Sequence, residues 1–224
     1  MVTDAHLWAE TYDRELTTSN IFAIQSEISQ SIAESLKATL SPEEKAQIET
    51  AQTGNMAALE AYFLGRQAMA RRTSASLAEA ERQFKKAIEL DPGYALAYVA
   101  LADTYALQTG YSGLPQSEYE SLAGPLVEKA LAINDRLGEA YISLAGFSDP
   151  DEAAKEAHYR KGISLAPGYV SGYHWYGTFL GRTGRPEEAL VQLEEAARLD
   201  PLSAIVRVSM GGVNERLGRF EQAR

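Results

Sequence analysis

Apolar residues recur at helical spacing along most of this chain. Near its amino end a stripe at every fourth position predicts one amphipathic helix, formed by Ile24, Ile28, Ile32, Leu36 and Leu40. Thr18 or Ser19 can cap its start, and Ser41-Pro42-Glu43-Glu44 opens a further helix with proline in its first turn. From residue 58 onward the helical pattern continues to the end, so the sequence predicts an all-α protein.

A repeat of 34 residues runs through the second part. Leu165-Ala166-Pro167 returns 34 residues later as Leu199-Asp200-Pro201, and Leu90-Asp91-Pro92 has the same form. Arg182-x-Gly184-Arg185 likewise returns as Arg216-x-Gly218-Arg219, and Ala189 as Ala223. Proline after each segment ends a helix because it lacks an amide hydrogen and crowds the preceding turn. A fixed period of this length indicates stacked helical units.

These residues resemble the tetratricopeptide repeat, a helix-turn-helix unit in which small residues let two helices approach closely. The resemblance implies an α-solenoid, a right-handed superhelix of helical hairpins. It covers residues 58–224 and divides them into five units, the last incomplete, with a helical linker before them. The expected units are 58–94, 95–137, 138–169, 170–203 and 204–224.

Local signals predict how individual helices begin. Ser76 with Glu79 is expected to form a capping box at the second helix of the first unit. In the third and most degenerate unit, Asp149 is expected to cap a helix whose first residue is Pro150. Pro125 is expected to kink or break the second helix of the second unit.

The front segment, residues 1–57, does not fit the repeat. Its run His6-Leu7-Trp8-Ala9-Glu10 alternates as a strand does, and Tyr12-Asp13-Arg14 and Phe22-x-Ile24-Gln25 follow. Together they resemble the end of a TolB-like domain, which in many bacterial signalling proteins leads into tetratricopeptide repeats. This resemblance implies a truncated domain and a parent of one of two kinds: a class III adenylate or guanylate cyclase, or a winged-helix transcriptional regulator.

Composition limits the classes of molecule that this segment is expected to bind. The formal net charge of the 224 residues is −10, which argues against nucleic acid or an anionic membrane surface as the partner of this segment. Residues 1–57 carry 9 acidic and 3 basic side chains, so the acidity is concentrated there. The absence of cysteine excludes disulfides and thiolate metal sites. No apolar run has the length of a membrane span.

No constellation of catalytic or cofactor-binding residues stands out. The three histidines, His6, His158 and His174, have no second histidine or carboxylate at convincing ligand spacing. There is no phosphate-binding Gly-x-x-x-x-Gly-Lys loop and no Gly-x-Ser-x-Gly elbow. We therefore expect no catalytic residue, no metal site and no cofactor in this segment.

The better functional candidate is the inner groove, which the first helix of each unit lines in such arrays. Counting from each unit start selects the residues expected to face a bound protein or peptide: Tyr62, Arg66, Met69, Val99, Asp103, Ala106, Ile142, His174, Trp175, Thr178 and Arg182. Positions that hold a terminal carboxylate in some chaperone-binding repeats carry Phe63, Ala100 and Ser143 instead, so that mode of binding is not expected.

The sequence thus predicts a non-catalytic, cytoplasmic protein-interaction module of a larger bacterial signalling protein, with a cyclase-like parent preferred. A winged-helix regulator as parent, or a purely structural self-association scaffold, remains open as an alternative. Because the last unit stops at Arg224, just inside its second helix, the chain reads as a fragment. Its incomplete repeat is expected to expose an apolar stripe through which homo-oligomers can form.

Overall fold

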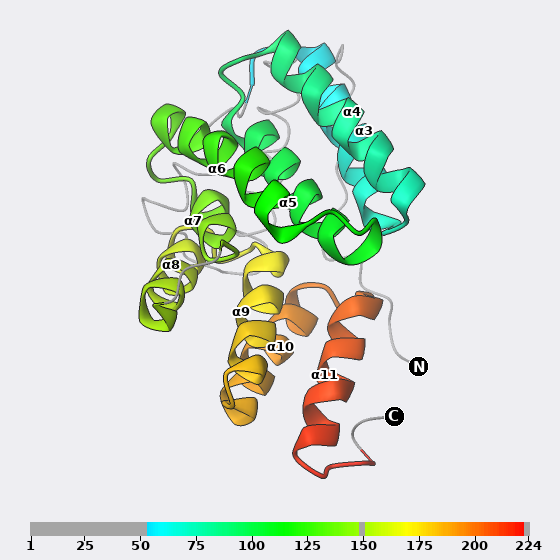
Figure 1. The fold of residues 1–224 in the computed structure, drawn as a ribbon, viewed down its shortest axis with the longest axis vertical. Coiled ribbons are helices and arrows are strands. Elements are labelled where there is room, and N and C mark those ends of the chain that lie inside the picture. Colours follow the sequence, from blue (N-terminus) through cyan, green and yellow to red (C-terminus); the bar gives the residue numbers. More distant parts are fainter. Residues whose placement is uncertain (1–52, 148–150, 222–224) are drawn as a thin grey trace, which may run out of the picture.

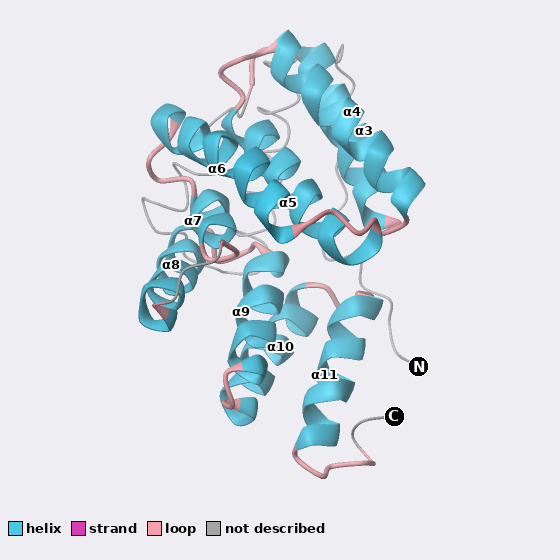
Figure 2. Cartoon of the chain, viewed as in Figure 1, coloured by secondary structure: helices cyan, strands magenta, loops and turns pink. Residues whose placement is uncertain are grey.

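A computed structural model describes residues 53–147 and 151–221, and within these ranges every regular element is a helix (Figures 1 and 2). The helices are α3 (Met56–Ala70), α4 (Ser74–Leu90), α5 (Ala95–Tyr111), α6 (Gln116–Ile133), α7 (Gly138–Leu144), α8 (Glu152–Leu165), α9 (Val170–Arg182), α10 (Pro186–Leu199) and α11 (Ala204–Arg216). The strand-like run from His6, the stripe from Ile24 to Leu40, the cap residue Asp149 and the repeated Ala223 lie outside the described residues.

Consecutive helices pack as hairpins, α3 with α4, α5 with α6, α7 with α8 and α9 with α10, and α11 packs on α10. The second helix of each hairpin also touches the first helix of the next. In Figure 1, α3 to α6 form one group, α9 to α11 form another, and the short pair α7–α8 lies between them along one side. Such nearest-neighbour packing is the organisation of a helical repeat array.

The turns show why the sequence repeats. At each junction into a new hairpin the same backbone bond recurs, from Tyr94 to Asp91, Leu137 to Asn134, Tyr169 to Ala166 and Ser203 to Asp200, each with the later amide donating. Gly184 and Gly218, one period apart, have φ of 81° and 70°, a region that L side chains rarely adopt. The amide of the following arginine then donates back into the helix, from Arg185 to Leu180 and from Arg219 to Asn214, both at 2.9 Å.

Glycines set the spacing inside three hairpins. A Cβ at Gly65 would lie 2.6 Å from the ring of Phe84, and one at Gly177 would lie 2.8 Å from Leu193. In the α7–α8 pair, Gly138 and Gly162 oppose each other, and a Cβ on either would lie 2.6 Å or 2.8 Å from the carbonyl oxygen of the other. These contacts explain why small residues recur where two helices of a hairpin cross.

The apolar core is divided at α7. Buried residues of α3 to α6, with Leu137 and Ala140, form one continuous cluster, and smaller side chains around Tyr94 extend it. Ile142 and Ala145 belong to a second cluster with residues of α8 to α11. The seven-residue α7 therefore contributes to both cores although it is the shortest helix described.

Three local predictions were wrong, two of them at helix starts. The capping box of α4 is formed by Thr73 and Ser76, one turn earlier than expected, because the Thr73 hydroxyl reaches the Ser76 amide at 3.2 Å. The cap of α8 is Asp151 rather than Asp149, with its carboxylate accepting from the amides of Ala153 and Ala154. Glu152 is therefore the first residue of that helix.

The third correction concerns a break at Pro125, which was expected to kink or break this helix; α6 runs unbroken from Gln116 to Ile133 with the proline inside it. The extra residues of the second unit also lengthen α5 as far as Tyr111, so that the connection itself is short, Ser112 to Pro115. This length matters at the site, because α5 extends well past the end of α7.

Candidate functional site: a pocket beside the short helix α7

A pocket opens where α7 ends early. Among the first helices of the hairpins, α5 has 17 residues and α9 has 13, whereas α7 has 7. The helix ends at Leu144, and Ala145 is its C-cap. α7 is thus about two to three turns shorter than α9 and α5 on either side of it.

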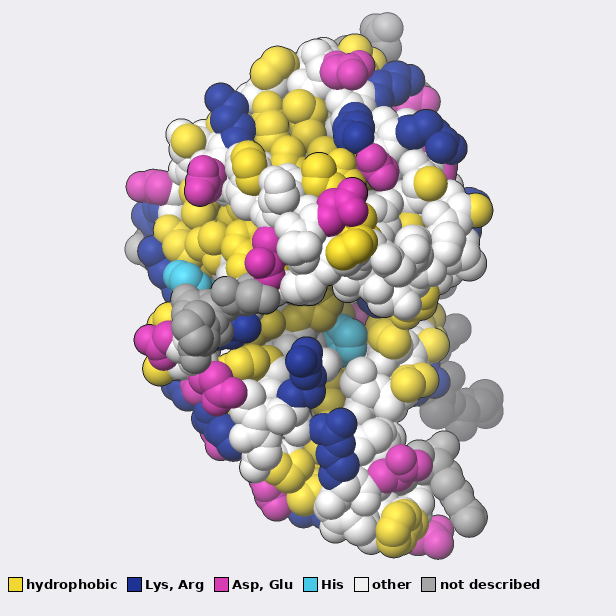
Figure 3. All heavy atoms as spheres, viewed as in Figure 1, with side chains coloured by type: hydrophobic (Ala, Val, Ile, Leu, Met, Phe, Trp, Pro, Cys, Tyr) yellow, Lys and Arg dark blue, Asp and Glu magenta, His cyan; other side chains and the backbone are white. Residues whose placement is uncertain are grey.

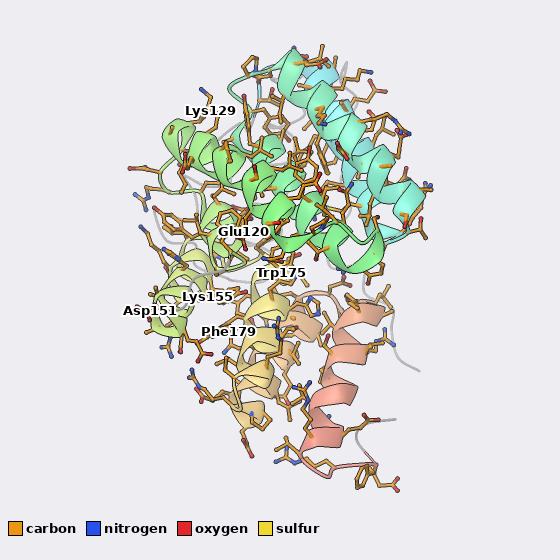
Figure 4. The ribbon with its side chains drawn as sticks, viewed as in Figure 1. Glu120, Lys129, Asp151, Lys155, Trp175 and Phe179 are labelled. Atoms are coloured by element: carbon orange, nitrogen blue, oxygen red, sulfur yellow. The ribbon has the colours of Figure 1, made fainter. Side chains whose placement is uncertain are left out.

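The pocket has a volume of about 270 Å³. Its lining residues come from five helices and the α7 turn: Ala106, Thr109, Gln116, Tyr119, Ser143, Ala145, Gly146, Lys155, Tyr159, Trp175, Thr178, Phe179 and Arg182. In Figure 4, Trp175 and Phe179 follow one another on α9, with Lys155 on the neighbouring α8, and Lys129 lies towards the far end of α6. On the face drawn in Figure 3, hydrophobic side chains gather along the waist between the upper and lower helices, with Lys or Arg side chains below them.

Aromatic packing fixes the wall on the α8–α9 side. The ring centroids of Tyr159 and Phe179 are 5.5 Å apart, and those of Tyr159 and Tyr176 are 5.3 Å apart and stacked. Across the pocket, Tyr119 lies 5.6 Å from Phe147. Such ring pairs add to their area of burial and restrict rotation, so this apolar wall is rigid before any ligand arrives.

Two charged side chains line the pocket among the described residues, and both are basic. Lys155 and Arg182 have no ion pair within the described ranges, whereas Arg160, Arg185 and Arg198 on the neighbouring helices are each paired with a glutamate. The positive charge of Arg182 also lowers the pKa of Tyr159, although burial raises that pKa more strongly. The pocket is therefore a cationic position in a chain of net charge −10.

Four of the residues predicted for the groove line this pocket: Ala106, Trp175, Thr178 and Arg182. Four others, Tyr62, Arg66, Val99 and Asp103, meet around a much smaller space of about 60 Å³ together with Glu139 and Tyr169. The structure thus divides the predicted residues between two places rather than along one continuous surface.

The smaller cluster is a buried polar network. Asp103 is 2% exposed and accepts hydrogen bonds from the hydroxyls of Ser143 (2.6 Å) and Tyr169 (2.8 Å). Burial raises its pKa to about 6, while these two hydrogen bonds and the charge of Arg66 act in the opposite direction. Burial also raises the pKa of Glu139 beside it. The network joins α5, α7 and the start of α9, which is a structural role.

The remaining predicted residues pack between helices. Met69 is half-buried and accepts a 3.5 Å hydrogen bond from Thr104, and Ile142 is fully buried against Gly162 and Gly172. His174 is 7% exposed, with Nε2 2.9 Å from the hydroxyl oxygen of Ser209. Burial, and then the charge of Arg72, lower the pKa of His174 to about 4, so its ring is neutral at physiological pH.

Sequence reasoning missed the aromatic and basic residues of the pocket that lie outside the counted positions. Lys155, Tyr159 and Tyr119 belong to second helices of hairpins, whereas the groove residues were counted on the first helices alone. A signal was present, because Lys155–Tyr159 and Trp175–Phe179 are both four residues apart and so share a face of their helix. The short third unit, residues 138–169, was a second indication that the inner surface is interrupted there.

The described residues contain no cluster of three or more histidine and acidic side chains able to hold a metal ion. Within the same part of the chain, no helix combines the length and apolarity required to cross a membrane. What the pocket offers chemically is a rigid apolar wall and two cations, an arrangement suited to recognition.

The fold is that of known repeat proteins. The crystal structure of TTC0263, a thermophilic TPR protein in Thermus thermophilus, superimposes with a TM-score of 0.54 at 21% identity, covering 75% of this chain and 86% of that one. MamA (TM-score 0.43, 22% identity, 75% and 86% covered) and YrrB, a TPR protein with an unusual peptide-binding site (0.41, 19%, 82% and 87%), are more distant. The likeness to TTC0263 confirms the predicted all-α tetratricopeptide fold.

No family model matches this chain. A similar curated protein is "Putative adenylate cyclase 3" of Rhizobium meliloti (strain 1021), which is 35% identical over 100 residues. The match covers 45% of this chain but only 17% of that protein. It agrees with the expected resemblance to the repeat region of a cyclase-type protein and extends over a small part of that relative.

Proposed function

We propose that this chain is a non-catalytic protein-interaction module that binds a segment of another protein in the pocket beside α7. The observation that carries the proposal is the meeting of an aromatic wall, two cations without an ion pair among the described residues, and the inner faces of α5 and α9 around one opening. Aromatic and arginine side chains are the residue types that dominate binding energy at protein interfaces. A gap of this size between stacked hairpins can receive one large side chain with its adjoining backbone.

Site-specific photo-crosslinking tests this proposal. A photoreactive amino acid replaces Thr178, which is exposed and lines the pocket, in the 224-residue chain. The matched control carries it at Lys129, which is exposed on α6 and lies away from the pocket (Figure 4). The two proteins are irradiated with soluble extract of the organism that makes them. We expect defined protein adducts from position 178 and none of them from position 129; equal labelling at both positions, or none at 178, would contradict the proposal.

We propose further that the module is the regulatory arm of a larger bacterial signalling protein of the adenylate or guanylate cyclase type, working in the cytoplasm. The 35% identity to the Rhizobium meliloti relative supports this, together with the front segment that resembles the end of a TolB-like domain. Docking of a partner would act on the neighbouring output domain only through different affinities for its two states.

Assays of the whole gene product separate this proposal from its alternatives. Cyclic nucleotide production that changes when Trp175→Ala is introduced supports a cyclase arm. Sequence-specific DNA binding without cyclase activity would instead support a winged-helix regulator. Light scattering over a range of concentrations tests the third alternative, since a scaffold that acts by self-association forms homo-oligomers.

A further inference from the structure

The pocket beside α7 has a chemistry that selects among partner segments. Its opposite walls come from α5–α6 and α8–α9, and its floor is the turn at Ser143 to Gly146. The floor is uncharged, and the aromatic rings of Tyr119, Tyr159, Trp175 and Phe179 surround it. A ligand must therefore supply an apolar or aromatic side chain to fill the space.

The charged side chains at the edge of the pocket, which we call the rim, favour a ligand of opposite charge. Lys155 and Arg182 lie on α8 and α9, and none of the described residues that line the pocket with them is acidic. Other cations on these helices and α10 are paired: Glu156 binds both Arg160 and Arg185, and Glu195 binds Arg198. Lys161 has no ion pair among the described residues either, but it lies over the ring of Tyr141 at 3.8 Å and does not line the pocket. At the pocket, the carboxylates of a partner can pair with Lys155 and Arg182.

We propose that the pocket binds an acidic segment of a partner protein, with one large apolar side chain inserted between Tyr119 and the Trp175–Phe179 wall and flanking carboxylates on Lys155 and Arg182. This inference rests on the proposed function and names the class of partner. The apolar anchor supplies most of the affinity, and the two cations select acidic segments and reject basic ones.

Selection from a library of random dodecapeptides displayed on phage tests the inference. Three forms of the chain are compared: the wild type, the double variant Lys155→Glu with Arg182→Glu, and the control Lys129→Glu, which makes a charge reversal on exposed α6. We expect the wild type and the control to enrich acidic peptides that contain an aromatic or large aliphatic residue. The double variant should enrich basic peptides with the same apolar residue, because only the rim has changed sign. Circular dichroism establishes that all three forms remain helical.

Defined peptides sharpen the result. Replacing the acidic residues of a selected peptide by their amides should weaken its binding to the wild type by about twofold to thirtyfold, the loss expected for two exposed ion pairs. The same replacement should strengthen binding to the double variant, because it removes repulsion between the peptide carboxylates and the two introduced glutamates. Trp175→Ala should weaken binding of both peptide forms.

Enrichment of neutral or basic peptides by the wild type, or an unchanged preference in the double variant, would overturn the inference, and so would the absence of any enrichment. Adducts at position 178 in the crosslinking experiment would in each of these cases leave the proposed function standing. The absence of adducts at position 178 would contradict both the inference and the proposed function.

Discussion

Among single residues, Asp103 carries a charge that is unfavourable to the fold. Its carboxylate is buried, and burial raises its pKa to about 6, above the ordinary value of 3.8. A raised folded-state pKa means that the folded protein holds the proton more tightly than the unfolded chain does. The contribution of Asp103 to stability is therefore fully present below about pH 4 and is lost as the pH rises to about 6, where the folded carboxyl loses its proton.

Asp103→Asn should remove this penalty. The amide can donate to the Ser143 hydroxyl, which then donates to the carbonyl of Glu139 at 3.2 Å, while the amide oxygen still accepts from Tyr169. We expect little change in the free energy of unfolding at about pH 4 and a gain of roughly 2–3 kcal/mol at about pH 8. Urea unfolding at both pH values measures it, with Asp135→Asn, on an exposed turn, as the control. A variant that is less stable than the wild type at pH 8 would show that the charge itself holds the network together.

Gly162 tests the close crossing of α7 and α8. A Cβ there would lie 2.6 Å from Ile142 Cδ1 and 2.8 Å from the carbonyl oxygen of Gly138. Gly162→Ala should therefore cost about 1–2 kcal/mol in urea unfolding, since overpacking outweighs the helix propensity that alanine gains. The matched control is Gly212→Ala in α11, where a Cβ meets nothing within 4 Å and alanine should stabilise by up to about 1 kcal/mol. Equal effects of the two substitutions on the free energy of unfolding would mean that α7 shifts away from α8 at little cost.

Individual residues show which features of the fold could be predicted from the sequence. The 34-residue period predicts the small residues at helix crossings and the glycines of the turns, because each has a local backbone requirement. It does not predict that Asp103, Ile142 and His174 are buried. Counting positions along a helix identifies a face, but whether the next hairpin covers that face depends on the angle at which the hairpins stack.

At the scale of the helices, the pocket exists because α7 is short and its neighbours are long. The sequence showed a degenerate third unit and a second unit, residues 95–137, that is longer than the 34-residue period. It did not show that the extra residues would extend α5 to Tyr111. Residues such as Lys155 and Tyr159 reach the inner surface only because the missing turns of α7 leave their side uncovered. The position of Lys155 and Tyr159 at the pocket depends on the shortness of the neighbouring α7. The pattern within their own helix carries no information about that neighbour.

Glu156 joins three elements beside this gap. Its carboxylate accepts from Arg160 within α8, from the hydroxyl of Tyr176 on α9 at 2.7 Å, and from Arg185 at the start of α10. The hydrogen bonds from Arg185, Tyr176 and Arg160 lower its pKa to about 2. A lowered folded-state pKa gives stability that is present above the ordinary value of 4.5 and is lost as the pH falls from there towards 2.

Glu156→Gln should therefore lower the free energy of unfolding by about 1 kcal/mol at neutral pH. The difference from the wild type should shrink as the pH falls below about 4, because the wild-type carboxyl becomes neutral as well. Glu195→Gln is the control, since its ion pair with Arg198 lies within α10 and is exposed, so its cost should be smaller than that of Glu156→Gln. Chemical unfolding over this pH range measures both. A difference that persists at low pH would assign the effect to packing rather than to charge.

For the whole molecule, the division of the core at α7 has a consequence for cooperativity. The two clusters of buried residues meet there, with Leu137 and Ala140 on one side and Ile142 and Ala145 on the other. Polar bonds of Asp103 to Ser143 and Tyr169 also cross this boundary. In an array whose units touch only their neighbours, stability is close to a sum of unit and interface terms, so a weak unit can open while the others persist.

Native-state hydrogen exchange should show this division. We expect the amides of α7 and α8 to exchange at a lower free energy of opening than those of α5 and α6. Gly162→Ala should lower protection mainly in α7, α8 and the start of α9, and leave α3 and α4 within error of the wild type, because α3 and α4 belong to the other cluster. Gly212→Ala, distant from α7, should change none of these. A uniform loss of protection from α3 to α11 in Gly162→Ala would instead mean that the array unfolds as one unit. The pocket beside α7 would then have to bind its partner without local opening of the helices that form it.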